Sequence, residues 1–395
     1  MSTNAVNPNP LSPATIVIHS ARLVTGGQIT ADAWVAFSGE RVLTVGSGDG
    51  WRELASAETA VTDAGGRWLT PGFVDIHCHG AGGAAFDDGI DGIRAALAVH
   101  RAHGTTRSVI SFVTNTGPAL LGSLRTVAEL ASIDPLVLGS HLEGPFLDTT
   151  YKGAHNEALL RSAAPAELDA MLDAASGTLR QITLAPELPG AQEAIARLVD
   201  AGVAVAVGHT AADYDQALAA FNAGASILTH AFNGMRGIHH RAPGPVAAAM
   251  HAGGVTLEVI NDGTHVHPEV VRMAFNAAPG RIALITDAMA ATGSADGDYL
   301  LGALAVTVTD GVARLVDGGS IAGSTLTLDD AVRRAVTEVG IGIETAIEAV
   351  TAVPARAIGR GDDLGTLAAG FAADALILND DFTVAAVWAN GAQLV

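Results

Sequence analysis

The chain has 395 residues, of which 49% are hydrophobic but only 4% aromatic, and this composition favours an aliphatic α/β core over an aromatic-rich β-sandwich. Its formal net charge of −20 argues against a surface for nucleic acid or anionic membrane, because phosphate groups are bound by basic faces. The single cysteine, Cys78, excludes an internal disulfide and a cysteine-based zinc or iron–sulfur cage.

The chain opens on short alternating stretches that predict strands of an antiparallel sheet over residues 15–27, 32–46 and 60–72. Residues 365–395 show the same alternation. The amino-terminal segment has no basic stretch followed by an apolar one, and nowhere do about 18 apolar residues run without interruption. We therefore expect a soluble, unprocessed protein of the cytoplasm.

Between these ends, β-branched runs alternate with Ala- and Leu-rich segments of helical period, such as residues 166–175 and 191–202. Eight such runs occur, at residues 72–80, 105–114, 135–144, 180–187, 203–210, 225–232, 255–263 and 281–289. Eight βα units in about 220 residues are typical of a (β/α)8 TIM-like barrel. After the last run, residues 297–319 predict a hairpin insertion, and residues 327–340 and 342–359 predict closing helices.

These patterns predict an α/β protein of two domains, which its length also suggests. Residues 1–68 plus 366–395 are expected to form a small β-sandwich domain from both chain termini, and residues 69–365 the barrel.

Imidazoles and carboxylates recur at the ends of the eight runs and are nearly absent from their interiors. They are His77, His79, Glu143, His209, His230 and Asp287. Because all strands of such a barrel end on one face, these side chains are expected to converge there. Imidazole and carboxylate ligands suit Zn²⁺, Fe²⁺, Co²⁺ or Mn²⁺ better than Ca²⁺ or Mg²⁺. The set predicts a metal site, although any one of these histidines alone is more often a structural, hydrogen-bonded group.

Two further residues at the ends of these runs have two interpretations each. His141 is a ligand or, as we favour, a group that orients a ligand. Glu187 binds substrate, or else it caps a helix or makes a structural pair. Strand alternation points His77 and His79 to one side and Cys78 to the other, outside the barrel interior.

The order of these residues resembles the amidohydrolase superfamily and, within it, the hexosamine-phosphate deacetylases. The likeness covers essentially the whole chain and is carried by "PGFVDIHCHG", "HLEGPF", "KGAH", "GHT", "THAFNGM", "RAPG", "NDGTHVHP", "TDAM" and "AGSTLTL". Many binuclear members bridge their metals with a carboxylated lysine, but the only lysine here, Lys152, follows "HLEGPF" in a predicted loop. Glu143 is therefore the better bridging or anchoring ligand, which argues against a dihydroorotase-like or hydantoinase-like site.

The resemblance implies one or two divalent transition metals per subunit, zinc foremost, and a homodimer. It implies a principal metal site of Glu143, His209 and His230, and a second or alternative site at His77 and His79, close to Asp287. It implies substrate contacts from Ala154, His155, Asn233, Gly234, Arg241, Asp262, His265, Ile321, Ala322 and Gly323. Arg241 and His265 are the expected phosphate contacts, one or both reaching a neighbouring subunit. A surface ion pair is the alternative role for Arg241.

The activity that the resemblance implies is removal of the acetyl group from N-acetylglucosamine 6-phosphate. Asp287 is expected to act as general base and then general acid, and His155 to hydrogen-bond the carbonyl oxygen as charge develops. Covalent hydrolysis is disfavoured, since no Gly-x-Ser-x-Gly elbow occurs and Cys78 lies on the wrong side of its strand. The alternatives are the N-acetylgalactosamine 6-phosphate reaction and a non-catalytic scaffold of the same fold.

Overall fold

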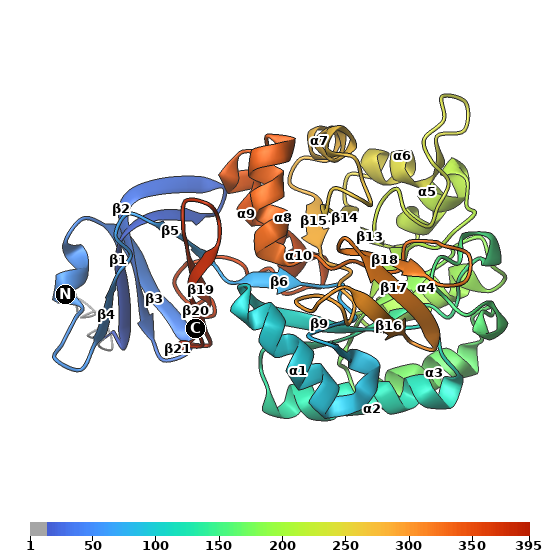
Figure 1. The fold of residues 1–395 in the computed structure, drawn as a ribbon, viewed down its shortest axis with the longest axis horizontal. Helices are drawn as coiled ribbons and strands as arrows, with labels where there is room; N and C mark the ends of the chain where they lie inside the picture. Colours follow the sequence, from blue (N-terminus) through green and yellow to red (C-terminus); the bar gives the residue numbers. More distant parts are fainter. Residues whose placement is uncertain (1–13) are drawn as a thin grey trace, which may run out of the picture.

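The computed structural model describes residues 14–395, so the part of the predicted small domain that falls on residues 1–13 lies outside the described residues. Figure 1 shows two bodies side by side, a small β domain that holds the first and last strands of the described chain and a larger barrel with helices around it. Within the described residues, no helix is both long and apolar enough to cross a lipid bilayer.

The small domain is one eight-stranded sheet in the order β21-β20-β19-β5-β1-β2-β3, with β4 also beside β1. Its strands are β1 Ile16–Thr25, β2 Gln28–Ser38, β3 Arg41–Ser47, β4 Ala60–Asp63, β5 Trp68–Pro71, β19 Ala375–Leu378, β20 Val384–Ala389 and β21 Ala392–Gln393. Val42 of β3 and Trp388 of β20 share one core, although their strands lie toward opposite ends of the sheet. The sheet therefore folds over its own core, as a small sandwich does.

The expectation of an antiparallel sheet is wrong at β1, which pairs in parallel with β4 over Ile16–His19 and with β5 at Arg22 and Leu23. The cause is the connection after β3. A two-residue hairpin would make the next strand antiparallel, but residues 48–59 cross from the edge of the sheet back to β1, and a crossover makes the strands parallel.

All eight predicted runs contain a strand of one parallel sheet in the order β15-β14-β13-β12-β11-β10-β9-β6. The strands are β6 Phe73–Asp75, β9 Thr105–Val113, β10 Val137–Glu143, β11 Leu179–Leu184, β12 Ala204–Val207, β13 Ile227–Leu228, β14 Thr256–Ile260 and β15 Ile282–Ile285. Just beyond β15 and β6, the Asp287 amide donates to the His77 carbonyl oxygen at 2.9 Å and the His79 amide to that of Ala288 at 2.8 Å. These bonds join the two edges and confirm the (β/α)8 barrel.

Helices cover the barrel because each buries one apolar stripe on the sheet. In α4, for example, Ala191, Ala194, Ile195 and Leu198 are buried at helical spacing. The helices are α1 Gly89–Ala102, α2 Gly117–Ile133, α3 Pro165–Ala175, α4 Ala191–Asp200, α5 Tyr214–Asn222, α6 Gly244–His251, α7 Pro268–Ala277, α8 Leu328–Arg334, α9 Ile343–Val350 and α10 Ala352–Ala357.

The predicted insertion forms a three-stranded antiparallel sheet rather than a two-stranded hairpin, with β16 Gly297–Leu301, β17 Leu304–Thr309 and β18 Val312–Leu315. Leu301 and Val306 pack with Val113, the last residue of β9. The insertion therefore lies against the carboxyl-terminal end of the barrel.

A buried ion pair ties the two domains together. Arg107 of β9 contacts Asp374 through two hydrogen bonds, Nε to Oδ2 at 2.5 Å and Nη2 to Oδ1 at 3.0 Å. Breaking such a pair commonly costs about 3–5 kcal/mol, because the remaining charge stays buried and unpaired. The pair therefore fixes how the small sheet sits on the barrel.

Candidate metal centre and active site

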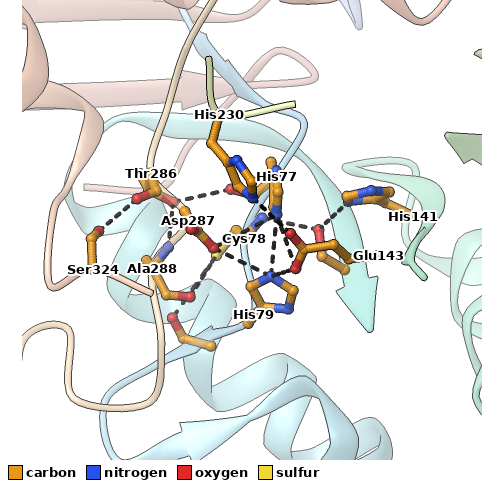
Figure 2. A network of polar contacts seen from close by, with 12 residues as sticks. His77, Cys78, His79, His141, Glu143, His230, Thr286, Asp287, Ala288 and Ser324 are labelled. Carbon is orange, nitrogen blue, oxygen red and sulfur yellow. Dashed lines mark hydrogen bonds and ion pairs between the residues drawn. The ribbon is translucent and has the colours of Figure 1, made fainter. Parts of the chain in front are cut away.

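Six imidazole and carboxylate side chains gather at the carboxyl-terminal ends of the barrel strands, where the sequence analysis expects them. They are His77 and His79 after β6, Glu143 at the end of β10, His209 after β12, His230 after β13 and Asp287 after β15. All are buried. Figure 2 shows His77, His79 and His230 around the carboxylate of Glu143, with Asp287 beside them.

The Glu143 carboxylate lies at the centre of the cluster and faces two imidazole pairs. Its Oε1 is 3.0 Å from Nε2 of both His209 and His230. Its Oε2 is 3.1 Å from Nε2 of His79 and 3.5 Å from Nε2 of His77. Each carboxylate oxygen thus faces a different imidazole pair. This arrangement suits a carboxylate that bridges two cations.

Asp287 approaches only one of the two pairs. Its Oδ1 is 3.3 Å from Nε2 of His79 and 3.6 Å from Nε2 of His77. Its side chain also lines the pocket above the cluster. Asp287 is therefore placed between the second pair of imidazoles and whatever occupies the pocket.

The hydrogen bonds behind the first pair direct its Nε2 atoms toward the cluster. His209 Nδ1 faces the Tyr151 carbonyl oxygen at 2.8 Å, and His230 Nδ1 faces the Asn233 carbonyl oxygen at 3.2 Å. A carbonyl only accepts, so each Nδ1 is the donor and each neutral ring has a bare Nε2. The two Nε2 atoms lie 3.0 Å apart. At this separation two nitrogen lone pairs repel each other unless a cation lies between them. Imidazole and carboxylate donors fit a divalent transition metal there.

The chain enters the site in a left-handed backbone conformation at three of the ligands. The φ angle is +47° at His209, +26° at His230 and +48° at Asp287. Non-glycine residues adopt this region rarely, and such strain gathers at functional sites where the surroundings hold it. These turns direct the side chains of His209, His230 and Asp287 toward the cluster, where a continuing strand would not direct them.

Two glycines make room for His209. A Cβ atom built on Gly234 would lie 3.0 Å from His209 Nδ1, and one on Gly153 would lie 3.0 Å from its Cε1. Both glycines also have φ between +50° and +65°. The predicted substrate residue Gly234 therefore also lets the backbone pack directly on a metal-ligand ring.

The carboxylates control the proton affinity of the second imidazole pair. Burial by itself lowers the pKa of His77, but Glu143 and Glu258 outweigh it and raise that pKa well above its ordinary value. Burial likewise lowers the pKa of His79, while hydrogen bonds with Asp287 and Glu143 raise it to about 9. A metal at this pair must therefore displace protons.

We expect the stability gained from metal binding to increase from pH 6.5 to about pH 9. In the metal-free protein the raised pKa of His79 stabilises the fold fully below its ordinary value of 6.5, and this contribution is lost as pH rises through about 9. The metal-loaded protein does not depend on that proton. Thermal unfolding with chelator and with added zinc, at several pH values, measures the difference in Tm; parallel curves would contradict the expectation.

His155 sits beside the cluster as a neutral hydrogen-bond donor. The Thr114 amide donates to its Nδ1 at 3.3 Å, so the ring proton is on Nε2, which lies 3.6 Å from Glu143 Oε2. Burial, followed by the nearby His209, lowers the pKa of His155 to about 3. The ring therefore offers one N–H to the pocket without carrying charge.

A pocket of about 260 Å³ opens above the cluster. Of the predicted substrate residues, it is lined by Ala154, His155, Asn233, Gly234, His265, Ile321 and Gly323. Ala322 does not line it and packs in the core beneath the insertion. Arg241 lies in an exposed loop, with Nη1 2.8 Å from His240 Nε2. Asp262 contacts His265 instead, Oδ2 to Nδ1 at 2.7 Å, which leaves His265 Nε2 for a ligand.

The structure also places the residues with two interpretations. His141 has both ring nitrogens hydrogen-bonded to hydroxyls, of Ser111 and Thr183, which agrees with an orienting role. Glu187 accepts from Thr210 Oγ1 and the Ala211 amide, which agrees with a structural pair.

Cys78 and Lys152 lie as expected. Cys78 Sγ faces His100 of α1, at 3.1 Å from Nε2, and so points out of the barrel interior. Lys152 directly follows the short 3-10 turn Thr149–Tyr151 in the loop after β10.

Sequence reasoning missed two buried carboxylates beside His77. Glu258 contacts its Nδ1 at 3.0 Å, and Asp75 accepts from its backbone amide at 3.2 Å. The expectation that polar residues are nearly absent from the interiors of the runs is wrong. Glu258 is the central residue of β14, and β9 and β11 carry Ser108, Ser111, Gln181 and Thr183. The available signal was a glutamate in the middle of the otherwise apolar run "VTLEVI".

Comparison with known proteins agrees with this site and fold. A model of the Amidohydrolase family matches residues 68–394. The chain belongs to the amidohydrolase family, the class of hydrolases that its barrel and its cluster of imidazoles and carboxylates define, and the expected family is thereby confirmed.

Within that family the chain is similar to deacetylases of phosphorylated amino sugars. It is 39% identical to an N-acetylgalactosamine-6-phosphate deacetylase of Escherichia coli O157:H7 over 336 residues, 84% of this chain and 89% of that protein. It is 35% identical to the N-acetylglucosamine-6-phosphate deacetylase of Vibrio furnissii over 378 residues, 94% and 92% of the two chains.

A solved structure gives the same result. It is a variant of the Mycobacterium smegmatis N-acetyl-D-glucosamine-6-phosphate deacetylase in complex with N-acetyl-D-glucosamine-6-phosphate, and it is 42% identical to this chain. The match covers 97% of this chain and 100% of the other, with a TM-score of 0.91.

Proposed function

We propose that the protein hydrolyses the N-acetyl group of N-acetyl-D-glucosamine 6-phosphate, releasing D-glucosamine 6-phosphate and acetate. The observation that carries the proposal is a buried metal-ligand cluster beneath a pocket that also presents Asp287, His155 and His265. A relative of 42% identity over nearly the whole chain, solved with this sugar phosphate, supports the choice of substrate.

The residues of the site divide into metal ligands and groups that transfer protons. Glu143, His209 and His230 would hold a divalent transition metal, which when bound supplies Lewis acidity and lowers the pKa of water. Asp287 accepts a proton from the attacking water and returns it to the amine nitrogen as the C–N bond breaks. His77 and Asp287 keep each other charged, because burial raises the pKa of Asp287 but His77 and then His79 lower it further.

The phosphate is assigned to His265 and Arg241. His265 lines the pocket and is oriented by Asp262. Arg241 is exposed at the surface of the single chain, so its contribution requires a neighbouring subunit, and we propose a homodimer that brings it there. A guanidinium offers paired donors that match phosphate oxygens.

Zinc is the proposed metal, with iron, cobalt and manganese as alternatives, at one or two ions per subunit. The catalytic unit is proposed to be residues 69–365, with residues 1–68 plus 366–395 as the small domain, and the cytoplasm as the location. The non-catalytic scaffold is rejected, because a scaffold has no need to keep Glu143, His209, His230 and Asp287 together and buried.

Deacetylation of N-acetylgalactosamine 6-phosphate is the second candidate, because a relative of 39% identity is a deacetylase of that epimer. The two reactions would use the same metal ligands and differ only where the 4-hydroxyl is bound. Parallel kinetics on both epimers decides between them through the ratio of kcat/KM.

Acetate release from N-acetylglucosamine 6-phosphate tests the function directly. We expect release by the purified protein, loss of release after chelation, and recovery with added zinc. Unphosphorylated N-acetylglucosamine, run alongside, is expected to be a much poorer substrate, because it lacks the group that His265 and Arg241 bind. No release with any of the four metals would reject the proposal.

Replacement of His155 by asparagine is expected to lower kcat by about 100- to 1,000-fold, the usual effect of removing one donor to a developing oxyanion. Metal content, measured on the same sample, is expected to stay unchanged, because the ligand atoms of Glu143 and His209 do not depend on this ring. Unchanged turnover of the phosphorylated sugar by His155→Asn would show that the ring has no such role.

A further inference from the structure

Glu258 lies in the middle of the barrel, beneath the metal-ligand cluster, with a fully buried side chain. Its Oε2 is 3.0 Å from His77 Nδ1, and it also accepts from the His230 amide at 3.3 Å. Its Oε1 accepts from Gln181 Nε2 at 2.7 Å. With three donors around it, both oxygens of the carboxylate act as acceptors.

A carboxylate at this position needs an explanation, because an apolar side chain would fill the same space without losing solvation. Among residues 14–395, the one ion pair that Glu258 forms is with His77. Its charge is thus compensated only through a group of the metal-ligand cluster, which points to a role in that cluster rather than in the stability of the barrel.

The contact determines which nitrogen of His77 faces the cluster. With Nδ1–H donated to Glu258, the Nε2 lone pair points toward His79 Nε2 at 3.2 Å and Glu143 Oε2 at 3.5 Å. His209 and His230 achieve the same orientation with neutral backbone carbonyl groups. His77 instead has a charged partner, which makes its imidazole a more basic ligand.

The carboxylates also set how much positive charge the site requires. Glu143, Asp287 and Glu258 place three carboxylates within one buried cluster. Asp75, which accepts from the His77 amide at 3.2 Å, adds a fourth buried carboxylate, so a single divalent cation leaves these negative charges incompletely balanced. From this balance and from the His77 contact, we propose that Glu258 is a positioning residue that prepares His77 for a second divalent metal beside the one at Glu143, His209 and His230.

The test is metal titration of the full-length protein after chelation, with Zn²⁺ alone, by calorimetry and by elemental analysis after dialysis. Wild type is expected to bind two ions and Glu258→Gln to keep the first, while its affinity for the second falls about 10- to 100-fold. The substitution can preserve the hydrogen bonds, because Gln181 Oε1 is buried and unpartnered in the described structure and a turn of that amide gives the new amide an acceptor.

The matched control is Gln181→Leu, which removes another buried contact of Glu258 but leaves the one with His77. It is expected to bind both ions as wild type does. Three results would each overturn the proposal. They are an equal loss of the second ion in Gln181→Leu, binding of only one ion by the wild type, and wild-type affinity for the second ion in Glu258→Gln.

If Glu258→Gln does not fold, Glu258→Asp serves in its place. This variant keeps the charge but shortens the side chain by one methylene, which moves the carboxylate oxygen away from His77. Its affinity for the second ion is expected to fall by the same factor. An unchanged affinity would overturn the proposal. The inference rests on the metal-dependent function proposed above, but the titration requires no turnover. A protein that binds two ions and releases no acetate would therefore reject the deacetylase and retain the role of Glu258.

Discussion

Replacing Asp287 by asparagine is expected to lower kcat by roughly 100- to 10,000-fold, the range that general acid–base groups contribute. The amide has the shape of the carboxylate but cannot take a proton from water or return it to the leaving nitrogen. Oδ1 of Asp287 lies near His77 and His79 and away from the pair that Glu143 Oε1 serves. The first metal is therefore expected to remain bound, and steady-state kinetics with elemental analysis measures both quantities.

Asparagine is also the right substitution for the backbone at this position. Asp287 has φ +48°, a left-handed conformation that asparagine tolerates better than most residues. Asp287→Ala would combine loss of the carboxylate with backbone strain, so its thermal stability is expected to fall where that of Asp287→Asn does not. Turnover by Asp287→Asn within about tenfold of wild type would assign the proton transfers to another group.

The barrel could be predicted because its strands are buried on both faces. Such strands form continuous apolar runs rather than alternating ones, and these runs stand out between helices of period 3.6. Even β13, which is only Ile227–Leu228, was found, since its run extends beyond the hydrogen-bonded residues.

Strand direction in the small domain could not be predicted in the same way. Alternation shows that β1, β4 and β5 each have a buried face, but it does not show which strand lies beside which. That depends on the path of residues 48–59 across the sheet, which no local pattern records.

The convergence of the six imidazole and carboxylate side chains could be predicted, because a barrel brings the ends of its strands together whatever their distance in sequence. The groups behind them could not. The proton on His155 Nε2 depends on the Thr114 amide, and the orientation of His77 depends on Glu258, 181 residues away. Such contacts exist only once the strands have closed the barrel, so the sequence shows the ligands but not what directs their lone pairs.

Replacement of Glu143 by glutamine is expected to remove both metal sites at once. One carboxylate oxygen faces His209 and His230, and the other faces His77 and His79. An amide keeps one acceptor oxygen but turns an NH₂ group toward the other imidazole pair. The hydrogens of that group then repel a cation at the pair. The transition state then loses several kcal/mol of stabilisation that the metal would supply, which lowers kcat by about a thousandfold or more.

Metal content and acetate release, measured together in Glu143→Gln, check this expectation. Glu143→Asp is the matched control, because it keeps the charge and moves only its position, so excess zinc is expected to restore part of its activity and none of that of Glu143→Gln. Two tightly bound ions in Glu143→Gln would mean that the carboxylate does not bridge the pairs. The two imidazole pairs would then be independent sites, and the second of them would depend on Asp287 and, through His77, on Glu258.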